Sequence, residues 1–274
     1  MKKTTSLIII SIIAAIFYPL SPQAFEKKFI LASIPPVASL VKMVAGDLAE
    51  VESIQNKSTC PHHYSLKPSD AKKINDADYI ILIDRSFDAS FFKAAKNSSA
   101  LKIEIAKFKD LEIKDGNLHI WLGYKNAKII LQGLREVLIS MGFDKNIIDN
   151  NYNIALNKIL FMQSSNSAKS DEKIVVIGEN LKYLLSDISS NEIYFFPKIV
   201  SLKKISELEN IIKTNNPKCI IHDSNIKIDQ LNYNKNLNFI ELDSENWGEI
   251  GDYKEYYINY LSYLYSRINH CFSK

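Results

Sequence analysis

Continuous hydrophobic runs alternate with helical patterns along most of this sequence. The runs lack the period-two alternation of a half-exposed strand, which is typical of parallel strands covered on both faces. The expected strands are residues 29–33, 51–54, 79–83, 101–105, 174–177, 193–195, 219–221 and 239–242. The expected helices are residues 37–46, 68–75, 89–96, 126–142, 144–164, 181–188, 204–214 and 253–269. This order predicts an α/β fold with parallel sheets.

The strand–helix alternation occurs twice, on either side of a long helical stretch. Residues 164–170 are small and mostly polar, which is typical of a hinge or linker. We therefore expect an N-terminal α/β lobe at residues 25–143, a connector helix and hinge at 144–170, and a C-terminal α/β lobe at 171–274. Two Rossmann-like lobes joined in this way would enclose a ligand cleft between them.

Residues 1–24 have the pattern of a secretory signal peptide. Two lysines follow Met1, an apolar run extends from Leu7 to Tyr18, and proline and small residues lead to Ala24. Twelve helical residues cover about 18 Å, which is too short for a bilayer core of about 30 Å. We expect this segment to be cleaved and the mature chain to be exported. A buried first helix is the alternative.

Composition argues against several classes of protein. The 274 residues include 34 basic and 31 acidic side chains, a formal net charge of +3, and no block of like charge, so nucleic-acid binding is not expected. With 8 glycines and no phosphate-binding or G-x-S-x-G motif, nucleotide-dependent catalysis is not expected either. Export permits disulfides, but spacing alone does not choose a pair among Cys60, Cys219 and Cys271.

Two short segments contain histidines that could bind a metal ion. His62 and His63 lie in Cys-Pro-His-His-Tyr-Ser-Leu-Lys-Pro-Ser-Asp, and His119 lies in Asn-Leu-His-Ile-Trp-Leu. Both segments fall at expected loop ends, where the ligand sites of parallel sheets collect. Adjacent side chains diverge, so one ion would usually take only one of the two neighbouring histidines. Surface-exposed polar histidines are the alternative interpretation.

The two histidine segments resemble motifs of a known family. Pro-His-x-Tyr-x-Leu-x-Pro-Ser-Asp around His62 is similar to the first metal-site motif of the periplasmic zinc- and manganese-binding proteins of metal ABC uptake transporters. His119, in His-x-Trp-Leu followed by Asn126-Ala127, is similar to the second motif. The later segments at residues 179–183, 219–221 and 242–243 follow in the family's order. The resemblance implies two lobes with a metal ion between them, bound by two histidines of the first lobe and two ligands of the second.

Carried over by position, the resemblance implies a metal site made of His62, His119 and Asp243, with a departure at the third ligand. Gly178 stands where the family has His or Glu, and Glu179 follows one residue later. Glu179 could reach the site by a local backbone shift. Otherwise the shell would be completed by another group, and the candidates are Cys60, His63, His222 and water. A solvated acid at a helix start for Glu179, and a turn residue for Asp243, stay open as alternatives.

The resemblance also implies the cargo and the partner. Two imidazoles with carboxylates suit Zn²⁺, with Mn²⁺ as the alternative, and such a site weakens below about pH 6 as imidazoles are protonated. The expected partner is the membrane permease of an ABC transporter. No small organic substrate and no enzymatic activity are expected, and we expect a monomer. In the zinc-binding branch of the family, a disulfide at the positions of Cys219 and Cys271 ties the last helix to the sheet.

Two other functions remain open from the sequence. An exported zinc metallohydrolase would use three protein ligands and an open fourth position, which Gly178 could leave to water, with Glu179 as the general base. No H-E-x-x-H spacing supports this interpretation. A family member that no longer binds metal is the other alternative.

Overall fold

The computed structural model describes residues 27–55, 65–166, 172–186, 193–196, 201–224, 226 and 237–272. The expected signal peptide at residues 1–24 lies outside the described residues, as do Cys60, His62 and His63. Within the described ranges, no helix has both the length and the apolar character needed to cross a bilayer.

The first sheet has four parallel strands in the order β2-β1-β3-β4. Both of its faces are covered, which explains the continuous apolar runs. On one face, Leu31 and Ile80 pack in a core with residues of α3 and α4. On the other face, Ile30 and Ile81 pack in the core that includes α2. Its strands are β1 (Lys28–Ala32), β2 (Ala49–Ser53), β3 (Tyr79–Leu82) and β4 (Leu101–Glu104), and its helices are α2 (Pro35–Ala45), α3 (Pro68–Asp76) and α4 (Ala89–Ala94). We call this unit the first lobe.

The second sheet repeats the same order, β6-β5-β7-β8, again with all strands parallel. Val175 and Ile220 face the core that includes α8, and Val176 and Ile221 face the opposite side, toward α9. Its strands are β5 (Ile174–Ile177), β6 (Ile193–Phe196), β7 (Cys219–Asp223) and β8 (Asn238–Leu242), and its helices include α7 (Lys182–Ser186) and α8 (Leu202–Asn215). This second lobe confirms the predicted fold of two parallel α/β lobes.

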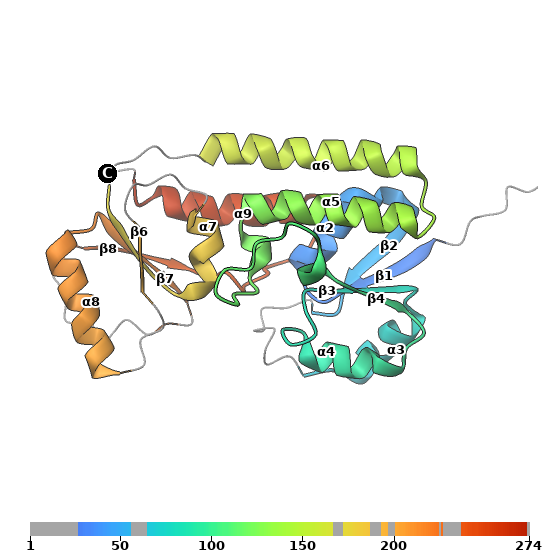
Figure 1. Cartoon of the computed structure of the whole chain (residues 1–274), viewed down its shortest axis with the longest axis horizontal. Helices are drawn as coiled ribbons and strands as arrows, with labels where there is room; N and C mark the ends of the chain where they lie inside the picture. The colour runs from blue at the N-terminus through green and yellow to red at the C-terminus, as the bar shows by residue number, and fades with distance from the viewer. Residues whose placement is uncertain are drawn as a thin grey trace, which may run out of the picture.

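Three long helices connect the two lobes: α5 (Tyr124–Ser140), α6 (Lys145–Asn166) and α9 (Tyr253–Asn269). Figure 1 shows them along one side of the molecule, with the second sheet and α8 at one end and the first sheet with α3 and α4 at the other. Helix α5 packs against α6, and α9 packs against α2 of the first lobe although it follows the second sheet in the chain. The largest apolar core therefore extends through both lobes.

Residues 164–166, which the sequence assigned to a hinge, belong to α6. Ser164 Oγ donates to the Phe161 carbonyl and Asn166 Nδ2 donates to the Met162 carbonyl, so both side chains bond back onto the last turns of the helix. Asn166 Nδ2 also donates to the Tyr124 hydroxyl of α5. Short 3₁₀ helices cover Gly46–Leu48, Ala95–Asn97, Ile105–Lys107, Ile120–Leu122 and Glu179–Leu181.

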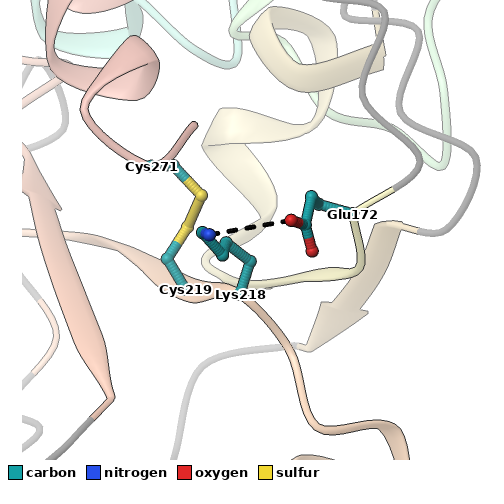
Figure 2. Close-up of a disulfide and its surroundings, with 4 residues drawn as sticks. All are labelled: Glu172, Lys218, Cys219 and Cys271. Atoms are coloured by element: carbon teal, nitrogen blue, oxygen red, sulfur yellow. Dashed lines mark ion pairs between the residues drawn. A yellow bond between two sulfur atoms is a disulfide. The ribbon is translucent and has the colours of Figure 1, made fainter. Parts of the chain in front are cut away.

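A disulfide between Cys219 and Cys271 closes the second lobe. Cys219 is the first residue of β7 and Cys271 follows the end of α9, and their Cα atoms are 5.8 Å apart. This is the pair that the family resemblance implies. Figure 2 shows the bond beside an ion pair in which Lys218 Nζ lies 3.6 Å from Glu172 Oε1. The disulfide therefore fixes the end of the last helix to the edge where β7 begins.

Reduction of this disulfide should lower the free energy of unfolding substantially. The two cysteines are 52 residues apart, and in the chain-entropy model the cross-link stabilises the folded state by about 4 kcal/mol. We expect urea unfolding to show a loss of this order when a reductant is added. The Cys219→Ser/Cys271→Ser double variant is the control, and its stability should not respond to the reductant. Equal unfolding curves for the oxidised and reduced wild type would contradict the expectation.

Asp88 is a buried carboxyl group at the end of the first sheet. Its side chain is buried, and Oδ2 accepts hydrogen bonds from the backbone N–H groups of Ile83 and Asp84 at 2.7 and 3.4 Å. Burial raises the pKa of Asp88 to about 7, against the opposing effect of these backbone donors. The neutral form is therefore favoured in the folded state over a range where an unfolded chain ionises.

Asp88→Asn should increase stability at neutral and mildly alkaline pH. Because the pKa in the folded protein lies above the unfolded value of 3.8, the wild type loses stability as pH rises from about 4 to about 7, and the amide does not titrate. The unfolding free energy of Asp88→Asn relative to wild type should rise by on the order of a few kcal/mol between about pH 4 and pH 8. Urea titrations at both pH values measure this difference, and a constant difference would refute the assignment.

Candidate metal site

His119 lies in the loop before α5, at the boundary between the lobes. Its ring contacts the ring of Phe87 edge-on, with centroids 5.6 Å apart, and the indole of Trp121 at 5.2 Å. Its side chain is 16% exposed, so the imidazole is partly shielded from water without being cut off from a ligand. The aromatic contacts restrict the ring to a narrow range of orientations.

Asn117 determines which nitrogen of His119 is available to a ligand. The Asn117 Nδ2 group donates to the carbonyl of Glu179 at 2.6 Å, so its Oδ1 atom faces His119. That oxygen accepts from the His119 backbone N–H at 3.0 Å and lies 2.9 Å from Nδ1. An amide oxygen only accepts hydrogen bonds, so Nδ1 is the protonated nitrogen and Nε2 is left to interact elsewhere.

Nε2 of His119 faces a carboxylate from the other lobe. Glu245 Oε1 lies 3.2 Å from Nε2, although the two residues are 126 positions apart in the chain. The Glu245 side chain is 14% exposed, close to the value for His119. The structure therefore brings together an imidazole of the first lobe and a carboxylate of the second.

The loop after β8 that contains Glu245 is anchored by a buried polar network. The Ser244 side chain is fully buried, and its hydroxyl donates to Asp223 Oδ2 at 2.8 Å. Asn180 Nδ2 donates to the same carboxylate at 2.5 Å and to the Ser244 hydroxyl at 2.9 Å. Asn180 follows β5, Asp223 ends β7 and Ser244 follows β8, and these three strands are neighbours in the sheet. The network therefore fixes the position of the Glu245 loop relative to the sheet.

Tyrosines of α9 connect both halves of the site. The Tyr257 hydroxyl donates to the carbonyl of Trp121, two residues after His119. The Tyr260 hydroxyl donates to the carbonyl of Ser244 at 2.6 Å, next to Glu245. Burial raises the pKa of Tyr260 well above its ordinary value, so the hydroxyl stays a donor. One helix thus fixes the spacing between the two loops that face each other.

Glu179 and His119 line the same cavity between the lobes. This cavity has a volume of about 250 Å³, and its walls include Phe87, Asn117 and Asn180. Glu179 is exposed, and its backbone carbonyl is the group that Asn117 binds. The structure therefore places Glu179 beside the same cavity as His119, whereas Glu245 is the carboxylate that contacts the imidazole.

Asp243 lines a different cavity, of about 470 Å³, together with Trp247, Tyr256 and Tyr260. One of its carboxylate oxygens accepts from the backbone N–H of Glu245 at 3.3 Å. His222, one of the candidates for completing the shell, is buried within β7 and its Nδ1 atom lies 3.1 Å from the carbonyl of Asp223. Within the part of the chain that the structure describes, no three His, Cys, Asp or Glu side chains form a metal-binding group.

Gly178 leaves no space for a ligand side chain in this conformation. Its φ angle is +127°, and a β-carbon there would lie 2.9 Å from Asn180 Oδ1 and 3.3 Å from the β-carbon of Asp223. The anchoring network thus occupies the space into which a side chain at the family's third ligand position would project. Glycine is required here both by its backbone angle and by these neighbours.

Sequence reasoning identified His119 but missed Glu245 and Asn117. Glu245 follows Asp243 by two residues, and the acidic, turn-like segment after an apolar strand was the available signal. Nothing in the sequence shows that the Ser244 side chain is buried. Because it is buried, the side chain of the next residue, Glu245, is directed toward the other lobe. Asn117 lies two residues before the histidine. At this spacing a side chain can orient the ring through a local hydrogen bond.

Two parallel-sheet lobes joined by long helices, with a histidine and a carboxylate facing each other between them, define the class of two-lobed solute-binding proteins. A family model described as zinc-uptake complex component A, periplasmic (ZnuA), matches residues 30–271. The chain therefore belongs to this family, as the sequence motifs indicated. Members of the family are metal-binding transport proteins, so neither the hydrolase nor the non-binding alternative is favoured.

Known proteins similar to this chain span bacteria of several groups. The uncharacterized protein RP014 of Rickettsia prowazekii is 35% identical over 244 residues, which cover 85% of this chain and 79% of that protein. The high-affinity zinc uptake system protein ZnuA of Buchnera aphidicola is 26% identical, over 71% of this chain and 61% of that protein. The Mn-bound periplasmic metal binding protein of Candidatus Liberibacter asiaticus has a similar fold, with a TM-score of 0.73, 19% identity and coverage of 88% of this chain and 98% of that one.

Gly178→Ala should destabilise the protein by about 1–3 kcal/mol, because it forces a non-glycine residue into a backbone region that is nearly glycine-only and crowds the anchoring network. Gly251→Ala is the matched control, since no atom lies within 4 Å of a β-carbon at that position and its φ angle is ordinary. We expect the control to change the free energy of unfolding in urea by less than about 0.5–1 kcal/mol. Equal effects of the two substitutions would show that position 178 tolerates a side chain.

Proposed function

We infer that this chain is the solute-binding component of a metal ABC uptake system, which captures a divalent transition metal ion in the periplasm and delivers it to the membrane permease. Membership of the family supports transport over catalysis. The observation that supports metal capture is the pairing of His119 Nε2 with the Glu245 carboxylate at 3.2 Å between the two lobes. An imidazole nitrogen and a carboxylate oxygen that face each other in this way are the donors from which transition-metal sites are built.

The proposed site combines His119 with ligands taken from the family motifs. His62 supplies the second imidazole and Asp243 a carboxylate, with Glu179 as a further candidate. His62 lies outside the described residues, so its part in the proposal is supported by the Pro-His-x-Tyr motif alone. Because Gly178 has no side-chain donor, His62, His119 and Asp243 leave one position of a four-coordinate site to another group.

Zinc is the cargo that we propose, with manganese as the alternative. Two neutral imidazoles favour Zn²⁺ over Mn²⁺ by ligand softness, whereas each added carboxylate makes the site harder and more compatible with Mn²⁺. The relatives include a protein named for zinc uptake and one whose structure was solved with manganese. The chemistry required of the chain is reversible coordination, with no bond made or broken in the cargo.

The geometry suggests how the site is preorganised for capture. Asn117 fixes the tautomer of His119, Phe87 and Trp121 restrict its ring, and Tyr257 and Tyr260 fix the distance between the two facing loops. A site that is already assembled loses little conformational entropy when the ion enters, which favours tight binding. Export through the signal peptide at residues 1–24 would place this site where scarce metal must be captured.

The mature chain, stripped of metal with a chelator, should bind Zn²⁺ with one-to-one stoichiometry in isothermal titration calorimetry. His119→Ala should weaken the affinity by more than about a hundredfold, since losing even an outer partner of a ligand typically costs about 10- to 100-fold. His62→Ala should have a similar effect. Parallel titrations with Mn²⁺ give the preference between the two ions.

His270→Ala is the matched control for these variants. His270 is exposed and follows the end of α9, far along the chain from the proposed ligands, so its replacement should leave the affinity unchanged. Absence of binding by the wild-type chain, or binding that survives both His119→Ala and His62→Ala, would refute metal capture at this site.

A further inference from the structure

We propose that Glu245 is a direct ligand of the captured metal ion and fills the coordination position that Gly178 leaves without a donor. This inference rests on the proposed function and specifies the donor set of the same site. It assigns a role to a residue outside the motif positions, on the basis of its contact with His119. Glu245 is preferred over Glu179 because its carboxylate contacts the imidazole, whereas Glu179 lines a cavity with His119 but has an exposed side chain.

The first argument is the separation of the two donor atoms. Two ligands bound at about 2.0–2.2 Å from a zinc ion at a tetrahedral angle lie about 3.3–3.6 Å from each other. Glu245 Oε1 and His119 Nε2 are 3.2 Å apart. An ion can therefore bind to both atoms while they shift by no more than a few tenths of an ångström.

The second argument is the direction of the lone pairs. Asn117 accepts from Nδ1 of His119, so the lone pair of Nε2 points toward Glu245. A carboxylate oxygen and an imidazole lone pair are both electron donors, and a cation between them satisfies both. The Asn117 amide thus directs the imidazole at the carboxylate in the way that metal-binding histidines are usually oriented.

The third argument is the rigidity of the loop on which Glu245 lies. Ser244 is fully buried and bonded to Asn180 and Asp223, and its carbonyl accepts from Tyr260. The backbone N–H of Glu245 donates to Asp243. Because these bonds fix the backbone immediately before the Glu245 side chain, the carboxylate is presented to the other lobe at little entropic cost.

The same network explains why the donor comes from residue 245 instead of residue 178. Asn180 and Asp223 occupy the space into which a side chain at position 178 would project, and both anchor the loop after β8. The absence of a donor at residue 178 and the presence of one at residue 245 therefore depend on the same two buried side chains, Asn180 and Asp223. With Glu245, the donor set becomes two imidazoles and two carboxylates.

The test compares three isosteric substitutions in the mature chain: Glu245→Gln, Glu179→Gln and Glu241→Gln. Glu241 is an exposed residue of β8, four positions before Glu245, and its replacement should not change metal affinity. Glu245→Gln should weaken Zn²⁺ binding by more than about a hundredfold in calorimetric titration. Glu179→Gln should weaken it by less than that amount.

Co²⁺ titration adds a readout that separates a ligand from a residue that only orients His119. If Glu245 coordinates the ion, the visible d–d absorption of the Co²⁺ complex should change in position and intensity in Glu245→Gln, and stay unchanged in Glu241→Gln. An unchanged spectrum in Glu245→Gln, even with weaker binding, would overturn the assignment of Glu245 as a ligand. Wild-type affinity in Glu245→Gln would overturn it as well.

The two levels of the proposal fail in different ways. If the wild-type chain binds Zn²⁺, His119→Ala does not, and Glu245→Gln binds as the wild type does, then only the inference about Glu245 is wrong. If the wild-type chain itself does not bind the ion, the proposed function is wrong. Urea unfolding of metal-free Glu245→Gln should match the wild type within about 1 kcal/mol, which shows that a loss of affinity is not a loss of fold.

Discussion

The packing of α9 across both lobes is the constraint on which the site depends. This helix follows the second sheet in the chain, yet it packs against α2 of the first lobe, and its tyrosines donate to the carbonyls of Trp121 and Ser244. The first carbonyl lies beside His119 and the second beside Glu245. The buried disulfide from Cys271 to Cys219 fixes the far end of the same helix. The distance between imidazole and carboxylate is therefore set by one rigid element and not by the two loops themselves.

The fold could be predicted because the information for it is local. Each strand that is buried on both faces must be apolar at every position, and each helix that covers a sheet must repeat its apolar positions at helical spacing. Residues such as Ile80 and Val176 satisfy this rule without reference to distant parts of the chain. The end of the connector helix was placed too early because Ser164 and Asn166 are residue types typical of linkers, while in the structure both belong to α6 and their side chains bond to carbonyls of the same helix.

The site could be predicted only in part because it depends on directions that the sequence does not specify. The motif around His119 identified the imidazole, since the motif is a short continuous segment. Glu245 faces that imidazole because Ser244 is buried by partners at the ends of other strands, Asn180 after β5 and Asp223 at the end of β7. No local pattern shows that three separate loops meet at this point. His222 shows the converse. Its residue type made it a candidate donor, but in the structure it is buried within β7.

Asn117 links the orientation of the His119 ring to the contact between the two lobes. A single amide group holds the imidazole of His119 with its oxygen and the backbone of Glu179, in the opposite lobe, with its nitrogen. The Tyr183 hydroxyl reinforces this junction by donating to the carbonyl of Asn117. Separation of the lobes at this point would break the bond from Asn117 to Glu179 and so displace the side chain that orients the His119 ring. Under the proposed function, separation of the lobes at this contact would also free the imidazole from the orientation in which it would bind the ion.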